Sequence, residues 1–555
     1  MSRRRFDSAP LVAIHEVRAL LGPGELRRDL LIEYLHRIQD GYNRISEDHL
    51  AALAQEVKLS RAEVFEVATF YHHFDVAPGG ALPPPSLTVR VCSSVPCRLA
   101  GATALLDELR ATLGDGVRVQ AVPCVGRCDA APVAVVRANP LGNADVAAVH
   151  RAIATSAFGA PMPAARGFDA YRTVGGYALY RACLGGERTA EQVMATLEHS
   201  GLRGLGGAGF PVGRKWRTVR GMPAPRYLAI NIDEGEPGTF KDRHYLEREP
   251  HAFLEGAMIA AWAVGLEKIW IYLRDEYAGC RALLHRELVA LRGAFPEAPA
   301  IELRRGAGAY VCGEESAMIE SIEGRRGIPR LRPPYVAEVG LFGRPTLEHN
   351  METLHWVPEI LKRGPDWFAA QGRNGRSGLR SFSVSGRVAK PGVYLAPAGI
   401  TLNQLIAEYC GGMAPGHRLH GYFPGGASGG ILPARLADLP LDFDSPTDVA
   451  TGDSLQSHEC FIGSAAIIIF SDQDAARDLA LNAMEFFALE SCGQCTPCRV
   501  GTKQAAVLMR DAAWDQERLV ELAQIMRDGS ICGLGQAAPN AMVSVLRHFS
   551  SEVGK

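Results

Sequence analysis

Eight of the thirteen cysteines in this chain fall into two sets of four, and these sets constrain its fold more than any other feature. In the first set, a C-x4-C pair and a C-x3-C pair are separated by 26 residues. The second set is a C-x2-C-x2-C run with a distant fourth cysteine. A site built from four thiolates requires the chain to bring four sulfur atoms to one point. The two sets are Cys92, Cys97, Cys124 and Cys128, and Cys492, Cys495, Cys498 and Cys532.

The bulk properties are those of an ordinary globular protein. At 555 residues, 47% hydrophobic and 22% charged, the chain is too long for a single core. A net charge of -2 gives no reason to expect nucleic acid or an anionic membrane surface as a partner. The run Arg3–Arg5 resembles an export signal, but His15, Glu16 and Arg18 interrupt the segment that should be apolar, and no run is long enough to span a bilayer. We therefore expect a cytoplasmic protein.

Each half of the first cysteine set follows a predicted strand. Residues 87–92 and 117–122 have the pattern of strands, which places the cysteines on the loops that follow them. In a reducing compartment, clustered thiols indicate metal ligation rather than disulfides. Zinc sites more often use shorter C-x2-C knuckles, so these wider loops favour a 2Fe–2S cluster. Zinc, or structural cysteines without a ligand, are the alternatives.

The second set indicates a different cluster. Three thiolates within seven residues and a distant fourth are the ligands expected of a cubane 4Fe–4S cluster. Zinc rarely uses this triple arrangement. The other cysteines have no partners at ligand spacing, and we interpret them as packing residues: Cys183, Cys280, Cys312, Cys410 and Cys460.

Between the two sets, Gly204–Gly209 matches the G-x-G-x-x-G fingerprint of dinucleotide-binding proteins. That fingerprint needs a strand before it and a helix after it. Here residues 189–199 have the pattern of a helix, and Phe210-Pro211 follows the last glycine, so a Rossmann interpretation fails. A loop that cradles a phosphate or a ring remains, because glycines let backbone N–H groups approach a ligand closely. Simple tight turns are the alternative.

Four long motifs around this loop closely resemble the FMN- and NADH-binding subunit of respiratory complex I. The resemblance runs from about Tyr171 to the C-terminus, and it implies that FMN and NAD are bound beside the clusters. The motifs, in the order in which the family has them, are residues 201–211, 231–243, 306–316 and 320–327.

A second resemblance covers most of residues 10–155, where helical periodicity precedes the first cysteine set. Val67-Ala-Thr-Phe-Tyr71 and the cysteines after it are similar to the thioredoxin-like 2Fe–2S subunit of complex I. The fold implied is multidomain, α/β and α+β. We expect a helical N-terminal segment at 1–80, a thioredoxin-like 2Fe–2S domain at 85–155, an FMN/NAD-binding α/β domain at 170–365, a small β-grasp-like domain at 378–445, a helical bundle with a 4Fe–4S cluster at 470–555, and linkers at 77–85 and 155–168.

The family resemblance implies roles for individual residues. One group would hold the FMN phosphate and ring edge, a second would bind its polar groups, and a third would complete the pocket. Phe210 would stack on NAD(H), with Glu236 and Glu315 near its hydroxyls or amide, although Phe210 as a core aromatic and Glu236 as a solvated loop acid are the alternatives. No acid or base is needed, and Glu234 and Glu315 would only position the reactants. The three groups are Gly204, Gly206, Gly207 and Lys215; Asn231, Asp233 and Glu234; and Tyr310, Gly313, Glu314, Asn350 and Thr353.

Four positions depart from the usual pattern of the family. Leu205 replaces a common arginine and His349 replaces an asparagine, which leaves the flavin contacts there open. Arg332 and Tyr335 stand where lysine and phenylalanine are frequent. They keep charge and aromaticity, so we expect both to serve in NAD binding.

Three further segments resemble the β-subunits of soluble NAD-dependent formate dehydrogenases: residues 346–356, 421–434 and 461–466. This resemblance implies a partner α-subunit that holds a molybdenum- or tungsten-pterin and further Fe–S clusters and oxidises formate, with no nucleic-acid or membrane partner. Fusion of the two complex I modules also occurs in NAD-reducing hydrogenases. The alternatives are therefore the diaphorase subunit of such a hydrogenase, or an electron-transfer or assembly subunit without NAD turnover.

Overall fold

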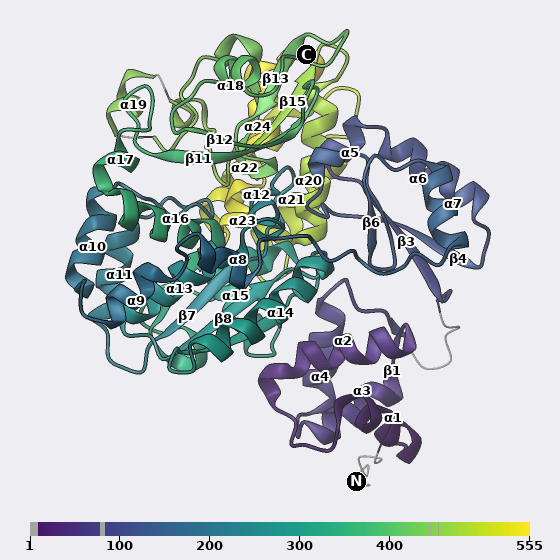
Figure 1. Ribbon diagram of the computed structural model, residues 1–555. Helices are drawn as coiled ribbons and strands as arrows, with labels where there is room; N and C mark the ends of the chain where they lie inside the picture. The colour runs from purple at the N-terminus through teal and green to yellow at the C-terminus, as the bar shows by residue number, and fades with distance from the viewer. Residues whose placement is uncertain (1–8, 78–83, 445, 453, 555) are drawn as a thin grey trace.

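The computed structural model describes residues 9–77, 84–444, 446–452 and 454–554 (Figure 1). The Arg3–Arg5 run and most of the predicted linker 77–85 lie outside these residues. Figure 1 shows a helical unit at the N-terminus, a small α/β unit beside it, and a larger body that contains the central and C-terminal parts of the chain. Among the described residues, none of the helices combines the length and apolar character needed to cross a bilayer.

Within residues 9–77, the N-terminal unit consists mainly of four α-helices. Ser60 starts the last of them with a capping box, because its hydroxyl accepts from the N–H of Glu63 while the Glu63 carboxylate accepts from the N–H of Ser60. Tyr71, just after this helix, donates its hydroxyl to the carbonyl of Arg325 at 2.8 Å, which fastens the unit to the central domain. The helices are α1 (Leu11–Leu21), α2 (Leu31–Tyr42), α3 (Glu47–Glu56) and α4 (Arg61–Phe70).

The small α/β unit is a four-stranded sheet in the order β4-β3-β5-β6. Its strands β3 and β4 run parallel, with Cys92 paired to Val122 at their ends. Because parallel neighbours end at the same edge of a sheet, the two halves of the first cysteine set emerge side by side. The elements are β3 (Leu87–Cys92), β4 (Val117–Val122), β5 (Ala134–Val136) and β6 (Asn139–Leu141), with helices α6 (Ala102–Thr112) and α7 (Val146–Ala154).

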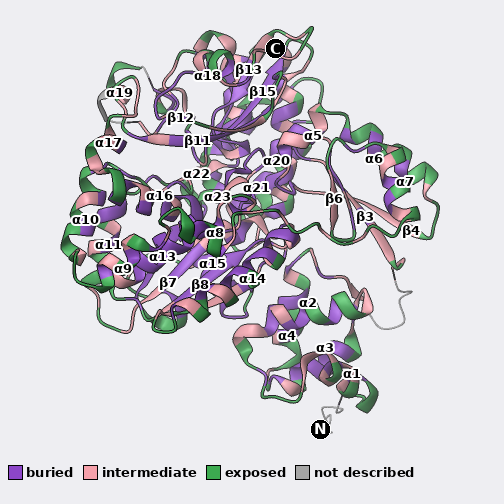
Figure 2. Ribbon diagram, viewed as in Figure 1, coloured by how far each residue is buried: buried purple, intermediate pink, exposed green. Residues whose placement is uncertain are grey.

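The central domain is built on a parallel sheet in the order β10-β7-β8-β9. The chain proceeds outward from β7 to β9 and then returns to place β10 on the other side of β7, so a topological switch point lies between β7 and β10. Figure 2 shows β7 and β8 largely buried among helices whose outer faces are exposed. The elements are β7 (Tyr227–Ile232), β8 (Lys268–Leu273), β9 (Ala300–Arg305) and β10 (Thr346–Asn350), with α13 (Pro250–Val264), α14 (Ala278–Ala294) and α16 (Met351–Arg363).

Two C-terminal units complete the body. The first is a mixed sheet in the order β12-β11-β15-β13-β14, and the second is a group of helices. The strands are β11 (Leu379–Gly386), β12 (Gly392–Pro397), β13 (Leu419–Phe423), β14 (Leu432–Pro433) and β15 (Ala466–Ser471), and the helices are α20 (Ala476–Glu490), α21 (Thr496–Leu508), α22 (Gln516–Gly529), α23 (Gly533–Ala537) and α24 (Asn540–His548).

Candidate functional site

The predicted flavin residues gather at the carboxyl edge of the parallel sheet, at its switch point. Asn231 lies near the end of β7 and Asn350 at the end of β10. The Asn231 amide donates to the carbonyl of Gly313 at 2.9 Å, which draws the third predicted group to this edge. In open α/β sheets, ligands bind in the crevice outside the strand ends at such a point. The topology and the sequence motifs therefore indicate the same crevice.

The glycine-rich loop covers one side of this crevice. It connects α10 (Ala190–His199) to α11 (Val212–Arg220), so no strand precedes it, as the sequence predicts. Its ends are joined by a hydrogen bond from the N–H of Gly204 to the carbonyl of Phe210 at 2.8 Å. The N–H of Leu205 donates to Thr353 Oγ1 at 2.9 Å, so the backbone carries the contact at this departure from the family pattern. A Cβ at Gly206 would lie 3.0 Å from Asn350 Cβ, so the loop rests directly on the strand end.

Two features of the crevice fit a flavin. Gly207 has a φ of 131°, and a Cβ there would have nothing but one backbone atom at 3.9 Å beside it, so its backbone borders open space. The Oδ2 atom of Asp233 is buried, and within the described residues it has no hydrogen-bond partner. Burial raises the pKa of Asp233 well above its ordinary value. Buried polar atoms in native proteins are rarely left unsatisfied, so a ligand with polar groups fits this position.

The residues predicted for NAD include an ion pair and two exposed aromatic side chains. Arg332 pairs with both Glu314 and Glu315, at 2.9 Å from Glu315, and Glu314 also caps α15 (Glu315–Ile322). Phe210 and Tyr335 keep 45% and 54% of their surface exposed, which is unusual for large aromatic residues that serve only the core. Exposed aromatic rings are suited to stacking on a nicotinamide or an adenine.

Two predicted residues lie in contacts within the protein. Lys215 forms an ion pair with Glu348 at 3.0 Å. The carboxylate of Glu234 accepts from the N–H of Asp242 at 2.8 Å and from the Tyr277 hydroxyl at 2.7 Å. Burial, followed by repulsion from Asp242, raises the pKa of Glu234 to about 7. Their predicted roles toward the flavin remain predictions.

His349, which departs from the family pattern, has a clear structural role. Its ring is buried, and its Nε2 accepts a hydrogen bond from the indole N–H of Trp216 at 2.8 Å. Burial lowers its pKa well below the ordinary value, which keeps the ring neutral and able to accept. The histidine therefore fixes α11 against β10 at a site where an asparagine is common in the family.

Sequence reasoning missed a buried ionic cluster beneath the glycine loop. Lys241, 2% exposed, places its ammonium 2.9 Å from both Asp242 and Glu352 and 3.2 Å from Asn350 Oδ1. Burial opposes the charged ammonium, but the two carboxylates outweigh it and raise the pKa of Lys241 above its ordinary value. The cluster holds Asn350, and with it the floor of the crevice. Its signal was present in the 231–243 motif, where Lys241 and Asp242 received no role.

The first cysteine set is enclosed. All four of its cysteines are buried, with Cys124 Sγ and Cys128 Sγ 3.4 Å apart, and the N–H of Gly126 points at Cys124 Sγ from 3.4 Å. Soft thiolates with backbone N–H support fit an iron–sulfur cluster. Arg274 and Arg243 of the central domain donate to the carbonyls of Cys124 and Gly126 at 2.6 and 2.8 Å. The loop is thus fixed against the end of the 231–243 motif, where Phe240 packs on Cys124 and Cys128.

The second cysteine set is connected to the third flavin motif, residues 306–316. Ser491 Oγ lies 3.3 Å from Cys498 Sγ, and the N–H of Tyr310 donates to Glu490 at 2.8 Å, which ties that motif to the end of α20. Burial above all, with a smaller contribution from nearby charges including Glu314, raises the pKa of Cys532 to about 12. Burial likewise raises the pKa of Cys492 and Cys498. Thiols that favour the protonated form need a cation to hold them as thiolates, which fits a metal cluster.

Four protein-family models match successive parts of the chain. Residues 19–157 match the thioredoxin-like [2Fe-2S] ferredoxin family, and residues 197–359 match the Nuo51 FMN-binding domain. Residues 381–432 match the SLBB domain, and residues 478–555 match the iron–sulfur binding region of NADH-ubiquinone oxidoreductase F. The fold and the site define a subunit of an NADH oxidoreductase that carries FMN, a 2Fe–2S cluster and a 4Fe–4S cluster.

Individual relatives show the family. The chain is 39% identical over 399 residues to the F 2 subunit of the NADH-quinone oxidoreductase of Rhizobium meliloti, covering 69% of this chain and 92% of that protein. It is 39% identical to the F subunit of the same enzyme in Streptomyces coelicolor over 69% of this chain and 86% of that protein. The chain belongs to the family of NADH-quinone oxidoreductase F subunits.

A solved structure resembles the chain over nearly its whole length. It is a chain of an NAD+-reducing [NiFe]-hydrogenase in the H2-reduced state, with a TM-score of 0.82 and 32% sequence identity. The match covers 95% of this chain and 92% of that chain.

Substituting Gly126 by alanine is expected to displace the first cysteine loop. Gly126 has a φ of 70°, and a Cβ there would lie well inside van der Waals contact with the buried hydroxyl of Tyr277. We expect purified Gly126→Ala protein to lose most of the iron of the first set, about two atoms per chain. Gly101→Ala is the matched control, because its φ is also positive, at 90°, but nothing lies near its Cβ. Equal iron in both variants, measured by mass spectrometry, would contradict this packing.

Glu236 is expected to make stability fall as pH rises. Burial raises the pKa of Glu236 to about 7 from 4.5, so its contribution is fully present below pH 4.5 and is lost as pH rises through about 7. Glu236→Gln removes this dependence. In melting of the flavin-free chain, we expect the variant to gain stability relative to wild type between pH 5 and pH 8.5. Glu408→Gln should show no such gain, because Arg373 lowers the pKa of that exposed residue. A constant difference for Glu236→Gln across this pH range would contradict the prediction.

Proposed function

We propose that this chain is the NAD-reactive diaphorase subunit of a formate dehydrogenase complex. Formate would be oxidised in a partner subunit that holds a molybdenum- or tungsten-pterin, and the electrons would reach NAD+ through this chain. The observation that supports a diaphorase role is that two segments of the chain connect the predicted flavin crevice with the two cysteine sets. The 231–243 motif leads from Asn231 at the crevice to Phe240 against Cys128, and the Tyr310–Gly313 segment leads from the crevice to the second set.

NAD exchanges electrons in pairs as hydride and Fe–S clusters carry one at a time, and a bound FMN accepts both modes. The residues of the chain would bind and orient. The glycine loop, Asn231 and Asn350 would fix the flavin, and Glu315 and Phe210 would place the nicotinamide against it. The buried Lys241 cluster would hold the floor rigid. Since hydride transfer needs no protein acid or base, positioning is the main contribution expected of the protein.

The carboxylate of Glu236 is fixed by hydrogen bonds, as expected of a residue that binds a ligand. Its Oε1 accepts from the N–H of Ser428 at 2.8 Å, and its Oε2 accepts from the hydroxyl of Tyr310. Two units of the chain therefore meet at this carboxyl group: the central domain, which contributes Glu236 and Tyr310, and the sheet domain, which contributes Ser428. This arrangement supports Glu236 as a binding group rather than a solvated loop acid.

The formate assignment is supported by the three segments at 346–356, 421–434 and 461–466. All three lie against the site. Asn350 and Gly463 contact the glycine loop, and Ser428 holds Glu236. A second candidate, the diaphorase subunit of an NAD-reducing hydrogenase, is favoured by the solved hydrogenase structure that matches 95% of the chain. The two candidates assign the same chemistry to this chain and differ only in the partner.

The partner distinguishes them. We would purify the tagged chain from its native cells with its complex and measure metal content with formate-dependent and hydrogen-dependent NAD+ reduction. Formate activity with molybdenum or tungsten is the expected result. If the complex contained nickel and reduced NAD+ with hydrogen but not with formate, the chain would instead be assigned to a hydrogenase.

A further inference from the structure

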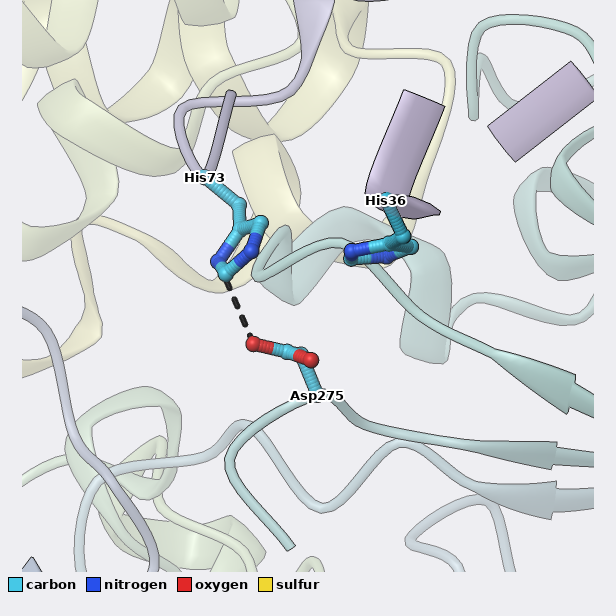
Figure 3. A group of neighbouring side chains, drawn as sticks. All are labelled: His36, His73 and Asp275. Carbon is cyan, nitrogen blue, oxygen red and sulfur yellow. Dashed lines mark ion pairs between the residues drawn. The ribbon is translucent and has the colours of Figure 1, made fainter. Parts of the chain in front are cut away.

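Two histidines and an aspartate meet where the N-terminal unit joins the central domain (Figure 3). His36 lies on α2, His73 follows α4, and Asp275 follows β8. One potential ligand atom from each lies within 4.8 Å of the other two. His73 and Asp275 also line a cavity of about 670 Å³ between these units and the small α/β unit. None of the three residues takes part in the flavin crevice or in either cysteine set.

One ring nitrogen of His36 is buried without a hydrogen-bond partner among the described residues. Its side chain is buried, with only 1% of the residue exposed, and its Nε2 lies 2.8 Å from the carbonyl of Gly306. A carbonyl only accepts, so Nε2 carries the proton and Nδ1 carries the lone pair. Within the described residues, Nδ1 is buried and has no hydrogen-bond partner. Metal-binding histidines have this arrangement, with one ring N–H given to a carbonyl and the other nitrogen free for the ion.

Asp275 is oriented in the way that a ligating carboxylate is. Its Oδ1 accepts from Arg305 Nε at 2.5 Å and from Arg281 at 3.3 Å. Its Oδ2 lies on the side of the histidines, 3.2 Å from His73 Nδ1. Outer hydrogen bonds on one oxygen fix the other toward an ion. Asp40 pairs with Arg305 at 2.6 Å and offsets part of the positive charge there.

A purely hydrogen-bonded contact between the units explains only part of this cluster. It accounts for His73 with Asp275 and for the two arginines. It leaves the buried Nδ1 of His36 without a donor, and an unsatisfied buried acceptor costs about 1–3 kcal/mol. Burial, as the largest cause, lowers the pKa of both histidines, which keeps them in the neutral form that binds metals. The unpartnered nitrogen is what distinguishes a ligand site from a simple contact.

We propose that His36, His73 and Asp275 form a site for a divalent transition-metal ion such as Zn²⁺, which clamps the N-terminal helical unit to the central domain. Two imidazoles and one carboxylate are ligands that such ions accept, and water from the cavity would supply the remaining position. The ion would join residues separated by more than 200 positions in the sequence, beside a cavity that Cys124, Asp233 and Tyr310 also line.

The test uses the full chain with its clusters and flavin loaded, so that no cysteine set is vacant. The protein is treated with a chelator, incubated with Zn²⁺ and desalted, and zinc and iron are then measured together by mass spectrometry. We expect about one zinc per chain, with zinc absorption spectra showing only N and O ligands at about 2.0–2.1 Å. His36→Gln and Asp275→Asn should retain less than a tenth of this zinc. His72→Gln is the matched control: this neighbouring exposed histidine also lines the cavity and should keep full zinc.

Three results would overturn the proposal: no retained zinc in the wild type, Zn–S distances of about 2.3 Å that place the ion on cysteines, or full zinc in His36→Gln. An iron content equal to that of the wild type indicates that a variant is folded. If either variant fails that check, His73→Gln replaces it, because His73 is less buried than His36 and the same loss of zinc is expected.

Discussion

Replacing Cys495 by serine is expected to lower the iron content from about six to about two atoms per chain, because it removes one of the four thiolates that would hold the 4Fe–4S cluster. Cys495 stands at the start of α21, as its N-cap, and is the middle cysteine of the triple run. The first set lies in another unit and should keep its two irons. The electron paramagnetic resonance spectrum of the reduced protein should lose one of its two cluster signals and keep the other.

The matched control for this substitution is Cys460→Ser. Cys460 is buried, with its Sγ 3.7 Å from Ser544 Oγ on α24, and it belongs to neither set. It should keep all iron. If Cys495→Ser retained about six irons, or if Cys460→Ser lost four, the assignment of the second set would be wrong.

Replacing Lys241 by methionine is expected to destabilise the central domain by about 3–5 kcal/mol, because it leaves two buried carboxylates without their cation. Asp242 and Glu352 both lie 2.9 Å from the ammonium, and Glu352 Oε1 has no hydrogen-bond partner within the described residues. Asn350 would also lose the ammonium that fixes its carbonyl oxygen, so FMN affinity should fall together with stability. Tryptophan fluorescence during urea unfolding measures the effect, since five of the six tryptophans lie between residues 216 and 367.

Lys268→Met is the control for this change. Lys268 pairs with Glu302 in the same domain, but both side chains are about a quarter exposed, and such pairs contribute about 0–1 kcal/mol. A similar unfolding midpoint for Lys241→Met and Lys268→Met would show that the buried cluster does not support the crevice.

The parts of the site that the sequence predicts are those whose residues are close together in the chain. Three thiolates in seven residues indicate an iron–sulfur cluster. The helix before Gly204 is enough to reject a Rossmann fold. Both halves of the first set follow strands, as the sequence predicts, and the structure adds that these strands are parallel neighbours.

The parts that sequence reasoning missed depend on long-range pairing. Glu352 reaches Lys241 only because β10 returns beside β7, and nothing in the local pattern near residue 346 specifies this register. The structural role of His349 similarly depends on a hydrogen bond from Trp216, which lies on a helix distant in the sequence. The meeting of His36 with Asp275 requires the docking of two units, which no local periodicity records. Local chemistry was therefore readable from the sequence, and the second layer of contacts that supports it was not.

The central claim is that this chain itself exchanges electrons with NAD. The most direct test is to purify it alone, load it with FMN and its clusters, and measure NADH-dependent reduction of an artificial electron acceptor. We predict steady turnover that requires FMN and persists in Cys495→Ser if the acceptor takes electrons at the flavin. A protein that holds FMN and about six irons but remains inert toward NADH would contradict the claim and indicate an electron-transfer or assembly subunit instead.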